Sequence, residues 1–486
     1  MAFSSTDWFH ATAIVTAAGW ACTADALTAL APDYGACART TITQTISVGP
    51  TGDYQAAVDA ALPGQRVLLE AGTYSNGLRI YDMNASTDNC IVIEGPTDQS
   101  AVFVGAPING IRNVVQIRNS SYVVVRNLRI DGTGTTDLDA IKSDANIAGA
   151  HPSAWSHHIT LENLHIHDFD FDQQQVGISS KGPAWNWVVR NNVIERVGTG
   201  LYLGNSDGGQ HFVNGLIEFN LIRDSVGYNA QVKHQFAASR PSGIGFETLP
   251  DPGRTVIRHN VLHKSGNSST GGAARPNLLV GTFPLTGPGS NDDYVIAQNF
   301  FYRNPTGFEA LFQGEGNLIL YGNLLYNDQG PAIFVQPQNG EVRRVRIFLN
   351  TVLSSAAGIF VSSSVNAAFT QLVHGNAVFA DGTAISGGSQ QDNISDSLSA
   401  ADSYLLMPNG GLPLDLYPLV GALSGTPINA GSLAGYPDGE LDFNDQGRDL
   451  SIRGAYGGSG QNPGWALALA IKQLLGEGLF TDGFED

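Results

Sequence analysis

The sequence predicts an all-β chain that forms a single-domain right-handed parallel β-helix. Two observations predict it: a recurring Asn motif, and the strand-like alternation of apolar and polar residues between its members. Nine times an Asn is followed within two residues by an apolar residue, at intervals of 24 to 40 residues. Short runs of Val, Ile, Leu and Phe alternate with polar residues between Gly and Asn turns. We therefore expect stacked coils in which each Asn tolerates a left-handed turn and its amide bonds to the next coil. The positions are Asn127, Asn163, Asn192, Asn220, Asn260, Asn299, Asn323, Asn350 and Asn376.

Composition narrows the class of protein. The chain has 486 residues, 42% of them hydrophobic, with 58 Gly and a formal net charge of −19. Charged residues make up 14%, which is low for a cytosolic helical protein and normal for an extracellular solenoid. The sequence has no basic run for nucleic-acid binding and no span of about 18 apolar residues for a membrane helix. We expect a monomer.

The chain divides into a leader, the coils, a closing segment and a tail. Asp53 caps an expected helix that runs to Leu62 and covers the open end of the coils, and a strand follows from Val67. Residues 464–478 are Ala- and Leu-rich and predict a short helix. The expected boundaries are 1–45 for the leader, 46–400 for the coils, 401–456 for the closing segment and 457–486 for linker, helix and tail.

Two terminal patterns favour export from the cell. An apolar stretch at 11–21 precedes Ala24-Asp25-Ala26, which is typical of a cleaved secretory signal. The last eight residues resemble a short tail on secreted proteins of some Gram-negative bacteria. We expect a secreted or outer-surface protein of such a bacterium. In that compartment Cys37 and Cys90 would form a disulfide; the alternative is that Cys22 and both of these stay reduced.

Strand parity assigns an outward face. Ile178, Leu201 with Leu203, Ala230 with Val232, and Leu278 with Val280 would point into the core, because strand side chains alternate. Lys181, Tyr202 and Lys233 then point outward, and two coils separate the lysines by roughly 10 Å. The two longest Asn intervals flank Asn260, which predicts loops at 235–255 and 264–293 beside this face.

This face has the residue types for cleaving an acidic polysaccharide by β-elimination. The reaction needs a cation that neutralises the uronate carboxylate, a base for the C5 proton and an acid for the leaving oxygen. The expected catalytic residues are Lys233, Arg240, Tyr202 and His234, and the expected substrate-binding residues are Lys181, Gln231, Arg275 and Lys142. The alternative is that these lysines are simply solvated.

The coils, the terminal plug and the outward Lys resemble the right-handed β-helix polysaccharide lyases, in particular the alginate lyase and chondroitinase B group. The resemblance covers about residues 50–460 and implies a Lys base, which maps to Lys233 in Gln231-Val-Lys-His-Gln235. It also implies an Arg on a neighbouring coil and calcium held by acidic residues and Asn. Val226 and Tyr228 stand where that group has acidic residues.

Other residues carry competing hypotheses. Asp168, Asp170 and Asp172 share one parity and would converge on a cation such as calcium, act as a glycosidase pair, or form a solvated turn. Glu247, Glu309 and Glu315 are further hydrolase candidates. The rival functions are therefore a β-helix glycoside hydrolase and a non-catalytic carbohydrate-binding or adhesive solenoid.

Overall fold

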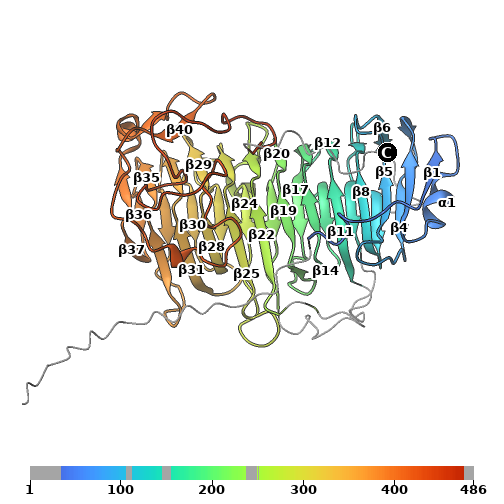
Figure 1. Ribbon diagram of the computed structural model, residues 1–486, viewed down its shortest axis with the longest axis horizontal. Coiled ribbons are helices and arrows are strands. Elements are labelled where there is room, and N and C mark those ends of the chain that lie inside the picture. Colours follow the sequence, from blue (N-terminus) through green and yellow to red (C-terminus); the bar gives the residue numbers. More distant parts are fainter. Residues whose placement is uncertain (1–33, 106–111, 145–154, 237–248, 250, 475–486) are drawn as a thin grey trace, which may run out of the picture.

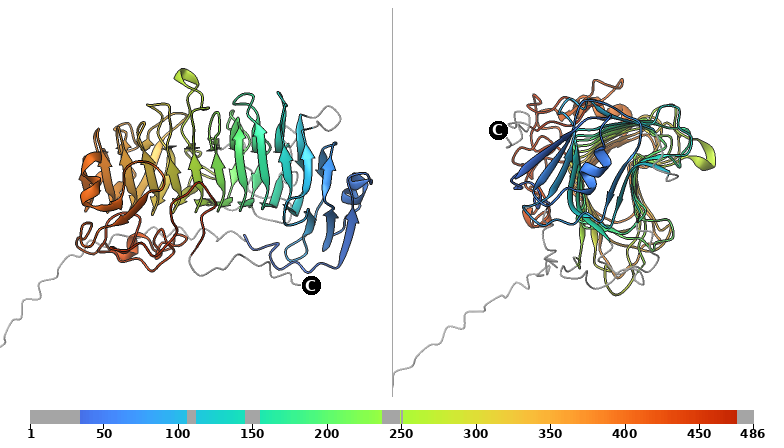
Figure 2. Two further views of the ribbon diagram at one scale, coloured as in Figure 1. Left: turned by 90° about the horizontal axis from the view of Figure 1, so that it is seen from above. Right: turned by 90° about the vertical axis from the view of Figure 1, so that its right-hand side faces the viewer.

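The computed structural model describes residues 34–105, 112–144, 155–236, 249 and 251–474, and it confirms the predicted parallel β-helix (Figure 1). Each complete coil adds one strand to each of three parallel sheets, called A, B and C below. Parallel strands joined this way cross over with a right-handed sense. The coils therefore form a long prism whose three outer faces are the outer surfaces of the three sheets (Figure 2).

The strands of each sheet follow one another along the axis of the coils. Sheet A consists of β1 (Gln44–Val48), β2 (Gln65–Leu69), β5 (Ile91–Glu94), β8 (Ser121–Arg126), β11 (Ser156–Glu162), β15 (Val188–Arg190), β19 (Leu216–Glu218), β22 (Arg254–Arg258), β25 (Asp293–Ala297), β28 (Gly316–Tyr321), β31 (Val342–Phe348), β34 (Gln371–His374) and β37 (Ser389–Gln391), with β14 (Ala184–Trp185) and β18 (Phe212–Val213) at its side.

Sheets B and C have the same arrangement. Sheet B consists of β3 (Gly72–Tyr74), β6 (Ala101–Val104), β9 (Arg129–Asp131), β12 (His165–Phe169), β16 (Val193–Val197), β20 (Leu221–Arg223), β23 (Val261–His263), β26 (Phe300–Tyr302), β29 (Leu324–Asn327), β32 (Thr351–Ser354), β35 (Ala377–Ala380) and β38 (Ile394–Asp396). Sheet C consists of β4 (Leu78–Tyr81), β7 (Asn113–Arg118), β10 (Asp139–Ser143), β13 (Val176–Ser180), β17 (Thr199–Leu203), β21 (Ala230–Val232), β24 (Leu278–Val280), β27 (Phe312–Gly314), β30 (Ile333–Val335), β33 (Ile359–Val361) and β36 (Ile385–Ser386).

The interior of the coils is a continuous apolar core, as strand alternation predicts. The inward residues of sheet C are almost fully buried and belong to one cluster; they are Ile178, Leu201, Leu203, Ala230, Val232, Leu278 and Val280. The predicted parity of this sheet is therefore confirmed, and the intervening residues project from its outer surface.

The Asn ladder lies at the turn from sheet A to sheet B, with one correction to its register. From Asn192 onward the ladder Asn are buried and follow a left-handed residue, rather than adopting that conformation themselves. Asn127 and Asn163 occupy the left-handed position, one residue earlier in their coils. At the following position, each Nδ2 donates to the Oδ1 of the next Asn at 2.9–3.0 Å, as far as Asn393. Asn163 Nδ2 instead donates back to Asn127 Oδ1 at 2.7 Å.

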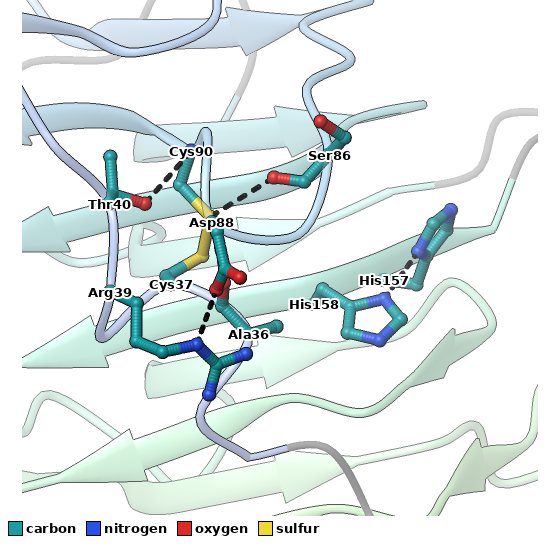
Figure 3. The surroundings of a disulfide bond; sticks show 9 residues. All are labelled: Ala36, Cys37, Arg39, Thr40, Ser86, Asp88, Cys90, His157 and His158. Atoms are coloured by element: carbon teal, nitrogen blue, oxygen red, sulfur yellow. Dashed lines mark hydrogen bonds and ion pairs between the residues drawn. A yellow bond between two sulfur atoms is a disulfide. The ribbon is translucent and has the colours of Figure 1, made fainter.

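The first coils are closed by α1 (Tyr54–Asp59), which lies across the end of the prism (Figure 2). Asp53 caps it by accepting the Ala56 N–H at 3.0 Å, as predicted, but α1 ends three residues before Leu62. The predicted Cys37–Cys90 disulfide is present and joins the segment before β1 to the start of β5 (Figure 3). It closes a loop over a separation of 53 residues beside the Arg39–Asp88 ion pair.

The closing segment returns along the coils after sheet B ends. It includes η4 (Leu398–Ser403), an antiparallel pair of β39 (Leu405–Met407) with β40 (Asp415–Pro418), and η5 (Ala430–Ser432). Two apolar clusters join it to the coils: one packs on sheet B around Phe300 and Tyr326, the other on sheet A around Tyr321. The closing segment thus covers the later parts of sheets A and B.

The predicted helix at 464–478 is wrong over its described part, because residues 464–474 contain no helix. Trp465, Leu467, Leu469 and Ile471 instead contact the cluster on sheet B at every second residue. That spacing belongs to an extended chain, so packing outweighs the helix propensity of Ala and Leu. The remaining residues of this prediction lie outside the described residues. Within the described chain, no helix has the length and apolarity needed to cross a bilayer.

Candidate active site

The outer face of sheet C carries a row of side chains at equivalent positions on successive coils. From β7 to β33 this row consists of Gln116, Lys142, Ser179, Tyr202, Gln231, Leu279, Gln313, Phe334 and Phe360. A second outward row lies just past the strand ends, where Gly204, Lys233 and Gly281 follow the paired residues Leu203, Val232 and Val280. Lys181 precedes Gly204 in this second row, after Ser180.

Tyr202 brings the two predicted lysines together. The Nζ of Lys181 lies 5.4 Å from the centre of the Tyr202 ring, and the Nζ of Lys233 lies 5.0 Å from it. Both cations thus contact one aromatic ring. Burial raises the pKa of the Tyr202 hydroxyl, so it remains protonated at neutral pH and can donate a proton. We call Lys181 and Lys233, which lie against the Tyr202 ring, together with Arg275, whose charge acts on Lys233, the cationic centre.

Lys233 has the environment of a general base. Burial, with the nearby charges of Arg275 and Lys181, lowers its pKa below the ordinary value of 10.5. Within the described chain, no carboxylate oxygen lies close enough to form an ion pair, which requires 4.0 Å or less, with Lys233, Lys181 or Arg275. A larger fraction of Lys233 is therefore the neutral amine near pH 8 than for a solvated lysine.

Two glycines leave room for Lys233. A Cβ on Gly204 would lie 3.2 Å from the Cβ of Lys233, and Gly204 has a φ of +85° that only glycine adopts readily. A Cβ on Gly281 would lie 2.3 Å from the His234 nitrogen and 2.9 Å from the Lys233 carbonyl carbon. The backbone at Lys233 therefore lies close to Gly204 on one adjacent coil and to Gly281 on the other, and neither residue has a side chain.

Arg275 comes from the predicted loop after β23, next to the short η3 (Gly271–Ala273). Its guanidinium lies 5.9 Å from the Tyr228 ring. Its backbone carbonyl accepts hydrogen bonds from Lys264 Nζ at 2.7 Å and Asn304 Nδ2 at 2.9 Å. Lys264 is buried, and this burial lowers its pKa to about 7. Lys264 and Asn304 thus fix the loop that presents Arg275, and sequence reasoning assigned a role to neither.

The other predicted residues have varied placements. Gln231 is buried beside Tyr202, and its Oε1 has no hydrogen-bond partner within the described chain. His234 is buried with its ring 4.9 Å from Phe236, and burial lowers its pKa. Lys142 lies 3.8 Å from Asp139 on β10. Arg240 lies outside the described residues. Their roles stay predictions.

Of the glutamate candidates for hydrolysis, Glu309 and Glu315 are described, and they have different surroundings. The carboxylate of Glu315 accepts four backbone N–H groups at 2.8–3.2 Å, from Thr282, Gln338, Asn339 and Gly340. It therefore stabilises a turn. Glu309 is half-buried near Lys264 and Arg275, and burial raises its pKa. Glu247 lies outside the described residues.

A metal ion could be held elsewhere, on sheet B. Asp131, His167 and Asp168 each offer one ligand atom, and these atoms lie within 4.8 Å of one another. Asp170 and Asp172 are not in this group, because β12 ends at Phe169 and both are exposed beyond it. Arg196 Nε already lies 2.5 Å from Asp168 Oδ1.

Calcium does not fit the cationic centre. The Asp131 group lies on β9 and β12 of sheet B, whereas Lys233 follows a strand of sheet C. Calcium takes oxygen ligands, and the groups around Tyr202 are cations without an ion-paired carboxylate in the described chain. Among the described residues, the ligands that the family resemblance implies near the Lys are therefore missing, and we derive no step through calcium.

Comparison with known proteins finds similarity in the shape of the coils. An alginate lyase from a Paenibacillus species has 16% identity and a TM-score of 0.44, covering 72% of this chain and 99% of that one. A family PL6 polysaccharide lyase from Pseudopedobacter saltans has 14% identity and a TM-score of 0.45, covering 77% and 97%. A lacto-N-biosidase from Eubacterium ramulus has 12% identity and a TM-score of 0.36, covering 73% and 68%.

These values carry no argument about the reaction that this chain performs. No protein-family model matches the sequence, and no curated protein sequence matches it either. The chemistry must therefore be argued from the residues of the site.

Proposed function

We propose that this protein is a polysaccharide lyase that cleaves a uronate-containing polymer by β-elimination on the outer face of sheet C. The observation that carries the proposal is the cationic centre. In a chain with a net charge of −19, Lys181 and Lys233 lie against the Tyr202 ring and the charge of Arg275 acts on Lys233, without an ion-paired carboxylate in the described chain. The long-range field of the protein repels polyanions, so this local group supports a specific site for a carboxylate.

Each residue type has a role in the reaction. Arg275 and Lys181 neutralise the uronate carboxylate, which makes the C5 proton acidic. The neutral amine of Lys233 removes that proton, and the electron pair forms a double bond between C4 and C5. The bond between C4 and the glycosidic oxygen breaks, and Tyr202 donates its proton to the departing oxygen. Lys233 then returns a proton to Tyr202 through solvent, which restores both groups.

The burial of the site supports these protonation states. The pKa of Lys233 is lowered and the pKa of Tyr202 is raised, so the base is more often neutral and the acid is protonated near neutral pH. A pair of neighbouring titratable groups, one with a lowered pKa and one with a raised pKa, is typical of sites that use one group as a base and the other as an acid. The disulfide between Cys37 and Cys90 favours an oxidising compartment, and we propose that the protein acts outside the cytosol.

Replacing Lys233 by Arg tests the proposal. Arginine keeps the positive charge but stays protonated, so it cannot remove the C5 proton. We expect Lys233→Arg to bind uronate oligomers and to have a kcat lower by a factor on the order of 10²–10⁴. The assay follows the near-ultraviolet absorbance of the unsaturated product on alginate, polygalacturonate and glycosaminoglycans.

Three results would overturn the proposal. New reducing ends without absorbance would show hydrolysis. Unchanged kcat in Lys233→Arg would remove Lys233 as the base. Binding without any cleavage by the wild-type protein would favour the adhesive solenoid.

A further inference from the structure

Lys264 is buried beside the cationic centre in surroundings that are unfavourable for a lysine. It is 1% exposed, and within the described chain no carboxylate oxygen lies close enough to form an ion pair with it. Its Nζ donates a hydrogen bond to the backbone carbonyl of Arg275 at 2.7 Å. Burying an amine for a carbonyl acceptor costs stability compared with an apolar side chain of similar length. What a lysine provides at this position, and a methionine would not, is therefore the contact with Arg275.

The backbone at Arg275 is held from two different coils. Lys264 follows β23, whereas Asn304 follows β26 and donates its Nδ2 to the same carbonyl at 2.9 Å. Asn304 is itself fixed, because it is buried and its backbone N–H donates to Asn327 Oδ1 at 3.1 Å. The next residue, Pro276, restricts the backbone of Arg275 to extended conformations. The peptide after Arg275 thus has little freedom while both donors are present.

The side chain of Arg275 is tied to the same loop. Its Nη1 donates to the carbonyls of Gly272 at 3.1 Å and Ala274 at 2.6 Å. Gln173 Nε2 donates to the carbonyl between them, that of Ala273, at 2.5 Å. Four consecutive carbonyls, from Gly272 to Arg275, therefore accept side-chain N–H groups. A shift of this backbone would carry the guanidinium with it.

The place of the Arg275 guanidinium matters for Lys233. Burial is the largest cause of the lowered pKa of Lys233, and the charge of Arg275 is the next. Charge interactions weaken with distance, so a displaced guanidinium would let the pKa of Lys233 rise toward its ordinary value. It would also weaken the binding of a carboxylate at the cationic centre.

Lys264 supplies a hydrogen bond to this arrangement rather than a charge. Burial lowers its pKa to about 7, with a further contribution from the charge of Arg275. Near pH 8 the side chain is therefore mainly the neutral amine, which still donates N–H groups. The positive charge that acts on Lys233 is then that of Arg275 and not that of Lys264.

We propose that Lys264 is a positioning residue of the candidate active site: its hydrogen bond to the Arg275 carbonyl holds the guanidinium where it binds the substrate carboxylate and acts on Lys233. Lys264 itself touches neither the substrate nor the reacting atoms. This inference rests on the proposed function, because it takes Arg275 as the residue that binds the uronate carboxylate.

A double-mutant cycle on the full chain tests the proposal. Calorimetry measures the binding of tetramers of polygalacturonate and of alginate, with every variant made in Lys233→Arg so that the ligand is not consumed. For the tetramer that binds better, we expect Arg275→Met to raise Kd about tenfold and Lys264→Met about fivefold. The double variant should bind like Arg275→Met, and not about fiftyfold more weakly than the parent, because Lys264 acts only through Arg275.

Two further variants separate this role from a general effect on the fold. Lys472→Met is the matched control, because Lys472 is also buried, has a pKa lowered to about 7, and donates to the Gln298 carbonyl at 3.3 Å, at the turn between sheets A and B. Its Kd should equal that of the parent. Asn304→Ala removes the other donor to the Arg275 carbonyl, so it should repeat the non-additive result if Lys264→Met does not fold.

The pH dependence of kcat/KM gives a second measurement, with Lys233 present. Lys264→Met and Arg275→Met should both move the midpoint to higher pH, because each takes a positive charge away from Lys233. A purely structural role for Lys264 would lower stability without moving this midpoint.

The outcomes separate the positioning role from the lyase reaction. Additive losses of affinity, or an Arg275→Met midpoint that moves while that of Lys264→Met does not, would overturn the positioning role and leave the lyase standing. Non-additive losses without any unsaturated product from the wild type would support the positioning role and overturn the lyase. Absence of binding of both tetramers by the wild type would overturn both.

Discussion

Replacing Gly281 by Ala should damage the candidate site through the backbone of Lys233. The added Cβ would lie 2.3 Å from the His234 nitrogen and 2.6 Å from its Cα, and both are backbone atoms that cannot swing away. Restoring ordinary van der Waals contact requires a shift of about 1 Å at Lys233–His234. A misplacement of this size lowers kcat by about 10²-fold, and overpacking destabilises by about 1–3 kcal/mol.

The assay combines kcat on the best uronate polymer with urea unfolding followed by circular dichroism. Gly266→Ala is the matched control, because Gly266 is exposed in the loop after β23 and its Cβ would meet nothing within 4 Å. We expect the control to keep wild-type kcat and stability. If Gly281→Ala keeps full activity while remaining folded, the position of Lys233 does not matter for the reaction.

Three further predictions follow from the contacts. Asn260→Ala removes five hydrogen bonds of the ladder, four of them buried, and should lower the free energy of unfolding by about 4 kcal/mol in urea, whereas Asn393→Ala at the half-buried end should cost less. The kcat/KM should rise with pH as Lys233 loses its proton, with a midpoint below 10.5; Lys181→Gln removes a neighbouring positive charge, so its midpoint should move to higher pH, and an unmoved midpoint argues against Lys233. The pKa of Lys264 is about 7 in the folded chain and ordinarily 10.5, so the unfolded chain binds more protons between these pH values. The free energy of unfolding of the wild type, measured in urea, should therefore rise by roughly 2 kcal/mol relative to that of Lys264→Met from pH 7 to 9. A difference that stays constant with pH would contradict this.

The repeat and the alternation predicted the coils because both are local properties of the chain. The register of the ladder was harder to predict. Asn191 and Asn192 are adjacent, and nothing local says which one turns left-handed and which one stacks. The same holds for residues 464–474, whose apolar residues fit a helix or an extended strap until the surface of sheet B selects the strap.

The candidate site could be predicted only in part. Parity places Lys181, Tyr202 and Lys233 outward, and the structure brings them together. The fixing of Arg275 by Lys264 and Asn304 joins residues from different coils, so no local pattern reveals it. The role of Glu315 depends on three consecutive backbone N–H groups of a later turn, which only the folded chain brings near.

The central claim is that the cationic centre breaks the polymer by elimination. The most direct measurement is cleavage of a defined uronate oligosaccharide in water enriched in heavy oxygen, with mass spectrometry of both fragments. Elimination adds no water, so the fragment masses should sum to the mass of the substrate, one fragment should carry the unsaturated ring, and neither should gain heavy oxygen at the moment of cleavage. A fragment that takes up one solvent oxygen, with no unsaturated ring, would contradict the claim.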